Sequence, residues 1–217
     1  LHLGCVTNTQ DTSGDVLEQH PVSVTRETLE ALLPRFTGAL LQVPPMYSAI
    51  KINGQKLYQL ARQGREVERP ARPVTIRELE LLGQDAQGDW LLRVLCSKGT
   101  YVRTLCHDMG QALGCGGCMS SLRRTMAAGF TLADSHTLEE VQAHGEALLA
   151  PTDSLFRQYP AYAVPSPEAE RRCRCGNPLT ADVPDGLYRV YDGDGTFLCL
   201  SRAENGTLTS LKNFFGA

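Results

Sequence analysis

Apolar residues along the middle of the chain follow first a strand period and then a helix period. From Trp90 to Cys96 they fall at every second position, which is typical of a strand with one buried face. Gly99 then allows the backbone to turn, and Gly114 stands where a helix commonly ends. Between these glycines the apolar positions recur at helical spacing: Val102, Leu105, Met109 and Leu113. The pattern predicts a strand–turn–helix unit, and polar side chains at its turn are candidates for a site.

The residues before and just after this unit predict shorter elements. Thr25 is a helix cap, and the helix after it carries an apolar stripe until Pro34 ends it. Residues 55–63 are predicted to form a short helix that ends at Gly64. Three further segments are expected to be extended or irregular: residues 43–48 with two prolines, residues 74–81 with a bulge, and residues 119–125, a strand that carries Leu122.

The last third of the chain predicts a helix, a linker and a small sheet. A capping box from Thr137 to Glu140 opens a helix that we expect to reach Leu149. Residues 151–165 are predicted to be a linker, and Ser166 caps the next helix. Three strands joined by glycine-containing turns then form a meander: Leu187–Tyr191, Thr196–Ser201 and Thr207–Leu211.

Length and composition are those of a globular protein. The 217 residues fit one large domain, or a medium domain followed by a small one. Charged residues make up 21% of the chain, and no apolar run of about 18 residues predicts a membrane span. Because no charged-then-apolar leader is visible at Leu1, we expect a cytoplasmic protein.

The distribution of charge changes this picture, although the net charge of −3 does not. Between residues 51 and 78, seven basic residues outnumber three acidic ones. Between residues 98 and 124, four basic residues outnumber one acidic residue, Asp108. A basic surface on an otherwise acidic protein favours phosphate binding, and an ordinary solvated charged face is the alternative.

Eight cysteines invite either a disulfide or a metal interpretation. Without a visible secretory signal, free thiols are favoured over disulfides. Cys115 and Cys118 have half-site spacing for zinc, and Cys173 with Cys175 would complete four thiolates. The spacing of the second pair is unusual for zinc, so the sequence predicts no metal.

Four stretches resemble motifs of one family. Residues 97–105, SKGTYVRTL, resemble the SKGTYxRTL motif of the bacterial TruB family of tRNA pseudouridine synthases, which act on the T-loop uridine. Residues 44–64 resemble the family's PPxYSAxK…GxxLYxxAR.G segment. The other two matches lie at residues 3–14 and at residues 113–124. The motifs keep the family's order from Leu1 to about Val141 and weaken after about Tyr159.

The resemblance implies a fold, a reaction and a partner. The fold is α/β in the broad sense (α+β), with a mixed, largely antiparallel catalytic core over residues 1–150. Residues 151–217 are expected to hold the linker and a small β-rich, PUA-like RNA-binding domain. The reaction isomerises uridine to pseudouridine, which requires the base to be flipped into a pocket. The partner is tRNA, bound through its T-stem-loop by a protein that we expect to be a monomer without a cofactor, nucleotide or metal.

The resemblance also assigns site residues, and one family feature has no counterpart here. The family's catalytic aspartate lies in a GxLDPxAxG segment that this sequence does not contain, so we expect these residues alone to be inactive. Arg103 matches the arginine that pairs with that aspartate, Tyr101 would line the pocket beside the uracil, and Leu122 would form an apolar wall. The alternatives are a surface arginine, a core tyrosine and a core leucine.

Candidate contacts to the RNA backbone come from the basic segments. Such contacts position an RNA without reading its sequence. They are Lys51, Lys56, Arg62, Lys98, Arg123 and Arg124. Taken one at a time, each is an ordinary solvated charge. Two other classes of protein stay open: a noncatalytic tRNA-binding or tRNA-folding module, and a zinc-stabilised interaction domain that rests on the cysteines alone.

Overall fold

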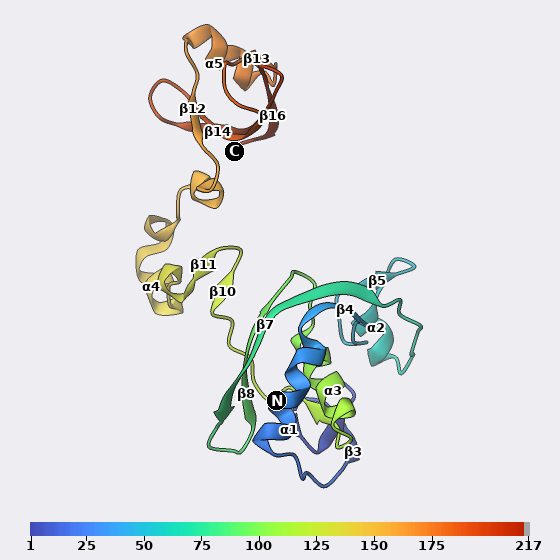
Figure 1. Cartoon of the computed structure of the whole chain (residues 1–217). Helices are drawn as coiled ribbons and strands as arrows, with labels where there is room; N and C mark the ends of the chain where they lie inside the picture. Colours follow the sequence, from blue (N-terminus) through green and yellow to red (C-terminus); the bar gives the residue numbers. More distant parts are fainter. Residues whose placement is uncertain (215–217) are drawn as a thin grey trace. The chain divides into compact units, whose positions relative to one another are not determined.

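The computed structural model describes residues 1–214, whose contacts divide the chain into two compact units (Figure 1). The first unit runs from Leu1 to Thr125, and the second begins at Met126. The sequence placed the boundary at residue 150, whereas the contacts group residues 126–150 with the second unit. The mixed class with mostly antiparallel strands is confirmed, since most strand pairs in both units are antiparallel.

The first unit contains a three-stranded antiparallel sheet. Its strands are β4 (Gly38–Gln42), β7 (Arg72–Gln84) and β8 (Trp90–Cys96), with β7 in the middle. The register between β7 and β8 shifts after Ile76 and again after Leu81. These irregularities confirm the bulged strand expected at residues 74–81, and the strand expected from Trp90 to Cys96 is also confirmed.

Two helices, α1 (Arg26–Leu32) and α3 (Val102–Ala112), pack with this sheet (Figure 1). The hydroxyl of Thr25 accepts a hydrogen bond from the backbone nitrogen of Thr28, which confirms the predicted cap. The α-helix gives way to a 3₁₀ turn, η1 (Leu33–Phe36), at the predicted proline. The core joins both helices to the sheet through Leu29, Ile76, Leu81, Trp90, Leu105 and Met109. Burial of these side chains fixes the position of α3.

Short strands near the N-terminus bring distant segments together beside α3. The pairs are β1 (His2–Leu3) with β9 (Gly117–Cys118), and β2 (Cys5–Thr7) with β3 (Val16–Gln19). Gly110 of α3 lies so close to β9 that a Cβ there would be 2.2 Å from the backbone nitrogen of Gly117. Only glycine permits this approach. Because β2 and α3 both contact β9, the loop after β2 lies close to α3.

A hairpin replaces the beginning of one predicted helix. β5 (Lys51–Ile52) pairs with β6 (Gln55–Lys56) around Asn53 and Gly54, whose φ angles are 49° and 81°. An Asn-Gly pair favours such a turn, because both residues tolerate positive φ. The helix expected at residues 55–63 therefore begins two residues later, as α2 (Leu57–Arg62). Gly64, with φ of 69°, follows its end as predicted.

The strand predicted at residues 119–125 is wrong. Residues 120–125 are irregular, and an isolated bridge joins Met119 to Asp11. Leu122 is 56% exposed, so the core interpretation of this residue is also wrong. The physical reason lies in the pattern: residues 120–125 contain a single large apolar side chain, which cannot form the buried face of a strand.

The second unit contains a five-stranded sheet. The strand order is β12 (Ala161–Ala163), β14 (Gly186–Tyr191), β15 (Phe197–Glu204), β16 (Thr207–Asn213) and β13 (Leu179–Thr180). The predicted meander is confirmed as β14–β15–β16, and the predicted helix as α5 (Pro167–Arg174), capped by Ser166. The linker prediction is wrong for β12, which pairs in parallel with β14. Its alternating Ala161-Tyr162-Ala163 pattern was too short to indicate a strand.

Residues 126–156 form small elements with few buried side chains. These elements are β10 (Met126–Ala127), β11 (Phe130–Thr131), η2 (Leu132–Asp134), α4 (Leu138–His144), η3 (Gly145–Leu148) and η4 (Thr152–Phe156). The capping box at Thr137 is confirmed. The helix expected to reach Leu149 ends at His144, because Gly145 adopts a positive φ of 52°.

Candidate functional site

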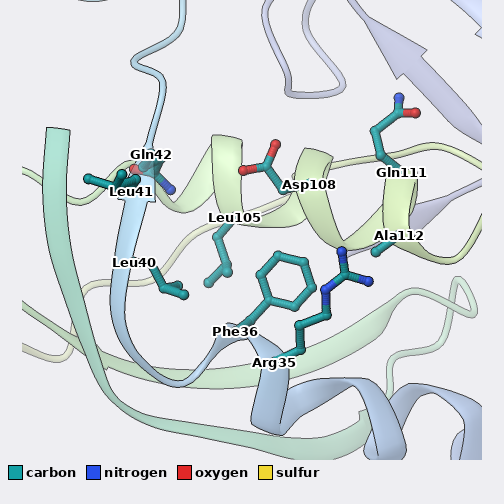
Figure 2. Close-up of a pocket in the computed structure, with 9 residues that line it drawn as sticks. All are labelled: Arg35, Phe36, Leu40, Leu41, Gln42, Leu105, Asp108, Gln111 and Ala112. Atoms are coloured by element: carbon teal, nitrogen blue, oxygen red, sulfur yellow. The ribbon is translucent and has the colours of Figure 1, made fainter. Parts of the chain in front are cut away.

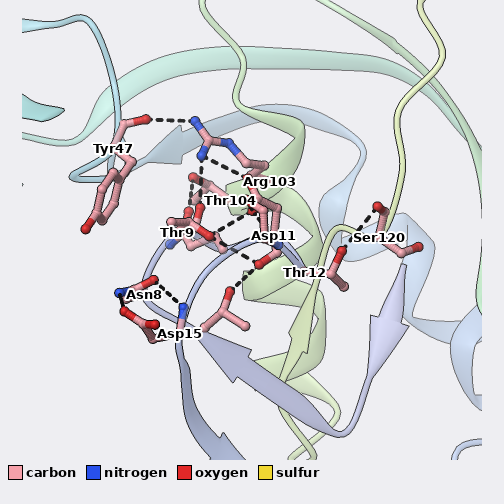
Figure 3. Close-up of polar contacts among 12 residues, drawn as sticks. Asn8, Thr9, Asp11, Thr12, Asp15, Tyr47, Arg103, Thr104 and Ser120 are labelled. Carbon is pink, nitrogen blue, oxygen red and sulfur yellow. Dashed lines mark hydrogen bonds and ion pairs between the residues drawn. The ribbon is translucent and has the colours of Figure 1, made fainter.

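The guanidinium of Arg103 joins three segments that are far apart in the sequence (Figure 3). Its Nη1 donates to the backbone oxygen of Thr9 at 3.0 Å and to the Asp11 carboxylate at 3.2 Å. Its Nη2 donates to the backbone oxygen of Tyr47 at 2.8 Å. The side chain is 23% exposed, so this arginine is neither deeply buried nor freely solvated. The arrangement holds a planar cation in one orientation at the start of α3.

Asp11 is itself held by its own loop. One carboxylate oxygen accepts hydrogen bonds from the Thr9 hydroxyl at 2.8 Å, from the Ser13 backbone nitrogen at 3.1 Å and from the Ser13 hydroxyl. Burial raises the pKa of Asp11, but the Ser13 and Thr9 hydrogen bonds and the charge of Arg103 outweigh burial, so the pKa lies below its ordinary value. Asp11 is therefore ionised at neutral pH and available as the counter-ion of Arg103.

The loop that carries Thr9 and Asp11 is fixed at both ends (Figure 3). Asn8 accepts a hydrogen bond from the Asp15 backbone nitrogen at 3.0 Å and donates to the Asp15 carboxylate at 2.9 Å. Gln10 has a φ of 63°, and its side-chain oxygen accepts a hydrogen bond from the Thr104 hydroxyl at 2.7 Å. Its backbone oxygen accepts from the nitrogen of Met119 at 3.0 Å. The Thr104 contact binds the loop to α3 directly beside Arg103, and the Met119 contact binds it to the segment after β9.

The start of α3 is held by a buried amide that the sequence analysis missed. The side-chain oxygen of Gln42 accepts a hydrogen bond from the Tyr101 backbone nitrogen at 2.8 Å, and its amide nitrogen donates to the Tyr101 backbone oxygen at 3.1 Å. Gln42 is 6% exposed at the end of β4. The side-chain amide of Gln42 thus makes the pair of hydrogen bonds that a neighbouring strand would make with the backbone of Tyr101. The sheet thereby positions Tyr101 and, two residues later, Arg103.

The chemistry open to Asp11 follows from its contacts. A base or nucleophile needs a free lone pair aimed at its target and a pKa suited to the reaction. One oxygen of Asp11 already accepts three hydrogen bonds, the other faces Arg103, and the pKa is lowered. Asp11 therefore suits the orientation of Arg103 better than attack on a substrate. Its position inside the residues 3–14 match was the signal that could have identified it.

Three of the expected RNA contacts gather on the β5–β6 hairpin and α2. Lys51 and Lys56 are directly opposite each other in the hairpin register. The ammonium of Lys56 and the guanidinium of Arg62 lie 5.6 Å and 5.5 Å from the centre of the Tyr58 ring. We call Lys51, Lys56, Tyr58 and Arg62 the hairpin cluster. Its like charges lie close together without an acidic partner among the described ion pairs, which favours an anionic ligand.

The remaining predicted site residues lie elsewhere on the first unit. Lys98 is exposed at the turn between β8 and α3. Arg123 and Arg124 are exposed in the irregular segment after β9, next to Leu122. All three are exposed, and a single basic face that joins them to the hairpin cluster remains a prediction.

A cavity of about 470 Å³ lies beside α3 (Figure 2). The α3 residues that line it are Leu105, Asp108, Gln111 and Ala112, and Arg103 is not one of them. Phe36 and Leu105 contribute apolar side chains to its lining, and Arg35, Asp108 and Gln111 contribute polar ones. Burial raises the pKa of Asp108, against the opposing effect of His107. Because Arg103 is not among the lining residues, this cavity is separate from the arginine network.

The cysteines considered for zinc belong to two different units. Cys115 and Cys118 are buried in the first, whereas Cys173 is buried and Cys175 exposed in the second. Burial raises the pKa of the Cys118 thiol to about 12, which opposes the thiolate that zinc requires. Across residues 1–214, no three His, Cys, Asp or Glu side chains are grouped to hold a metal ion. In that same range no helix is long and apolar enough to cross a membrane.

Comparison with known proteins identifies the class. Residues 1–102 match the TruB family pseudouridylate synthase (N terminal domain), and residues 103–157 match the tRNA pseudouridylate synthase B C-terminal domain. A tRNA pseudouridine synthase B from Stutzerimonas stutzeri (strain A1501) is 47% identical over 220 residues, which cover 96% of this chain and 71% of the relative. The relative of the same name from Ectopseudomonas mendocina (strain ymp) is 48% identical over 206 residues, covering 90% and 67%.

Solved structures agree on the fold. A chain in the crystal structure of a Cbf5-Nop10-Gar1 complex superposes with a TM-score of 0.64 and 21% identity, covering 90% of this chain and 63% of that one. This chain therefore spans less than two thirds of that structure's length. The protein belongs to the class of pseudouridine synthases. More narrowly, the chain belongs to the TruB family, as its motifs predicted.

Proposed function

We propose that this chain supplies most of a tRNA pseudouridine synthase that isomerises the T-loop uridine. The observation that carries the proposal is the convergence of three family-like segments on one guanidinium. Arg103 lies in the residues 97–105 match, Tyr47 in the residues 44–64 match, and Thr9 with Asp11 in the residues 3–14 match. Structural contacts of motif residues far apart in the sequence support a shared role for these motifs at one site.

The roles at this site follow from the chemistry of the reaction. Breaking and remaking a glycosidic bond requires the target base to leave its stack and enter a protein pocket. Arg103 would keep the aspartate of the GxLDPxAxG segment ionised and oriented, because a guanidinium binds a carboxylate in a fixed geometry. Tyr101 would lie beside the uracil. Leu122 would contact the base as an apolar wall, and its 56% exposure leaves that side chain available for such a contact.

Binding of tRNA would precede this chemistry and use other residues. Lys56 and Arg62 of the hairpin cluster place two positive charges beside the Tyr58 ring, and Lys51 adds a third opposite Lys56 in the hairpin. Together with Lys98, Arg123 and Arg124, they would contact phosphates of the T-stem-loop and set its position rather than read its sequence. The sheet of the second unit would serve as the PUA-like RNA-binding domain. The protein would act as a cytoplasmic monomer that needs no cofactor.

Tritium release from 5-tritiated uridine in a T-stem-loop RNA tests the function. We expect no release with the 217 residues alone, because they contain no GxLDPxAxG segment. We expect release once a TruB segment with this motif is joined to them, and no release when its aspartate is changed to asparagine. An anticodon stem-loop with tritiated uridine is the control for the T-loop target. Turnover by the 217 residues alone, or equal turnover of both RNAs, would contradict the proposal.

A noncatalytic tRNA-binding or tRNA-folding module is the second candidate. The hairpin cluster favours it, because that cluster does not depend on the missing motif. The two functions separate in one comparison: the extended chain should bind and isomerise the T-stem-loop, whereas a module would only bind it. Binding by the extended chain without any release would favour the module.

A further inference from the structure

Two buried thiols face each other in the core of the second unit. The sulfur of Cys173, on α5, lies 3.5 Å from the sulfur of Cys199, on β15. Cys173 is 3% exposed and Cys199 is fully buried, and both belong to the cluster of apolar side chains between the helix and the sheet. We propose that these residues form an oxidative modification site, in which a disulfide links α5 to β15. This site is independent of the proposed enzymatic function.

The hydrogen bonds around the pair prepare one sulfur as the nucleophile. Cys199 lies within hydrogen-bond distance of Cys173 and, at 3.2 Å, of the Ser201 hydroxyl. The hydrogen bond from Cys173 lowers the pKa of Cys199 against the effect of burial, with further help from Ser201 and Ser210. The same hydrogen bond and burial raise the pKa of Cys173. Cys199 is thus the sulfur that reaches the thiolate form more easily, and thiolates are the reactive species.

The oxidant is a peroxide, and the reaction balances without any group from the protein's active site. The Cys199 thiolate attacks one peroxide oxygen, the O–O bond breaks, and the hydroxide released takes up a proton to become water. The resulting sulfenic acid is attacked by the sulfur of Cys173. The S–O bond breaks as the S–S bond forms, and a second water leaves with the Cys173 proton. Two thiols lose two electrons in total, and one hydrogen peroxide is reduced to two waters.

Burial makes this site slow but selective. The sulfurs must approach each other from 3.5 Å to about 2.05 Å, a small movement for a helix that rests on a sheet. Peroxide reaches them when α5 moves away from β15, because neither sulfur is accessible otherwise. Cys175, at the end of α5, is exposed and serves as the internal comparison. After oxidation the disulfide would fix α5 on the sheet and limit unfolding of this unit.

Mass spectrometry of the full chain tests the proposal. The protein is incubated with hydrogen peroxide at neutral pH, free thiols are then blocked, and the digest is searched for cross-linked peptides. We expect a peptide that joins Cys173 to Cys199 and lacks two hydrogen atoms, and its loss on treatment with dithiothreitol. We also expect the melting temperature of the second unit to rise by about 10 °C in the oxidised protein. Cys175→Ser should leave the cross-link unchanged.

The outcomes that would overturn the proposal are measured on the chain without substitutions, so they do not depend on whether a variant folds. If Cys175 is oxidised to an acid while Cys173 and Cys199 are still free thiols when the blocking reagent is added, the pair does not react. A cross-link that contains Cys175 would assign the site to a different pair. Cys173→Ala, which places a small apolar side chain in the core, should abolish both the cross-linked peptide and the rise in melting temperature.

Discussion

Each unit contains an aspartate that pairs with a helix arginine, but the surroundings of the two pairs differ. Asp192 is 7% exposed in the turn between β14 and β15 and accepts hydrogen bonds from two backbone nitrogens of its own turn, those of Asp194 and Thr196. Arg174 of α5 donates to the same carboxylate at 3.1 Å. This pair joins segments that are 18 residues apart and closes a turn of the sheet.

The pair in the first unit spans a longer distance in the sequence, and its aspartate is the more exposed of the two, whereas Arg174 is more exposed than Arg103. Asp11 and Arg103 are 92 residues apart, and their side chains are 20% and 23% exposed. Loss of Asp192 would remove the acceptor of two backbone nitrogens of its turn, whereas loss of Asp11 would leave Arg103 with two backbone oxygens as acceptors. We therefore expect the Asp192 pair to stabilise its turn and the Arg103 pair to act in the proposed site.

The largest effect expected from this comparison is on catalysis. In the chain extended with a GxLDPxAxG segment, Arg103→Ala should lower the single-turnover rate by roughly ten- to sixty-fold. The pair that is lost is the one between Arg103 and the aspartate of that segment. Breaking a buried pair costs about 3–5 kcal/mol, and we expect half of this cost to appear in the barrier. Arg103→Lys should recover only part of the rate, since a point charge cannot replace the planar fork. The tRNA dissociation constant should change little, because binding is spread over many phosphates.

Arg93→Ala is the matched control for this experiment. Arg93 pairs with Glu80 on the exposed face of the sheet at 3.0 Å, and its side chain is 65% exposed. Its removal should leave both the single-turnover rate and the dissociation constant near their original values. A near-normal rate for Arg103→Ala would remove Arg103 from the site and weaken the assignment of the whole residues 97–105 segment.

The second effect is on stability and belongs to the other pair. Asp192→Ala should destabilise the second unit by about 2–4 kcal/mol, because a buried carboxylate that accepts from two backbone nitrogens and from Arg174 is lost. Hydrogen exchange of amides in β14 and β15 measures this loss. Asp194→Ala, at an exposed position of the same turn, should change exchange very little. Equal protection in the two variants would show that the carboxylate of Asp192 does not hold the turn.

The elements that depend on neighbouring residues could be predicted from the sequence, whereas those that depend on distant contacts could not. The meander of the second unit, the Thr25 and Thr137 caps and the bulged β7 depend on neighbouring residues, and all of them were predicted. The start of α2 was placed two residues early because the Asn53-Gly54 turn signal was not weighed. The strand β12 was missed because its stability comes from pairing with β14, about 28 residues later.

The candidate site shows the same limit more sharply. Periodicity placed Arg103 at the start of a helix, but only the resemblance gave it a role. That Arg103 meets Asp11 and the backbone of Tyr47 depends on strand pairings and on the close approach of Gly110 to Gly117, which no local pattern encodes. Gln42 was missed for the same reason, since its partner Tyr101 is 59 residues away.

A smaller effect is expected at Asp11. In the extended chain, Asp11→Asn should lower the single-turnover rate about two- to ten-fold, because a partly exposed pair contributes about 0.5–1.5 kcal/mol and Arg103 keeps its two backbone acceptors. Asn8→Ala is the control for damage to the loop, because Asn8 braces the loop without contacting Arg103. If Asn8→Ala lowers the rate as much as Asp11→Asn, the carboxylate has no particular role.

Acid titration adds a second measurement at Asp11. The pKa of this carboxyl is lower in the folded protein than its ordinary value of 3.8. The stability from its ionised form is therefore fully present above pH 3.8 and is lost as the pH falls through the lower folded pKa. We expect the difference in unfolding free energy between the original chain and Asp11→Asn to be constant at neutral pH and to shrink below pH 3.8. A difference that grows on acidification would contradict the lowered pKa.

The smallest effect concerns the salt dependence of RNA binding, and it separates the two basic regions of the first unit. Lys51, Lys56 and Arg62 are concentrated in the hairpin cluster, whereas Arg123 and Arg124 stand in an irregular segment. Each phosphate contact contributes about one unit to the slope of log affinity against log salt. Changing Lys51 and Lys56 to Gln should therefore lower the slope by about two units, and changing Arg123 and Arg124 should do the same if both reach the RNA. Changing Arg26 and Arg93, which have carboxylate partners, should leave the slope unchanged.

A T-stem-loop RNA and the 217 residues are sufficient for this measurement, because binding does not require turnover. If only the hairpin variant changes the slope, the RNA rests on one region and the single basic face is disproved. If neither variant changes it, both regions are solvated surface, and the affinity for RNA must come from other residues.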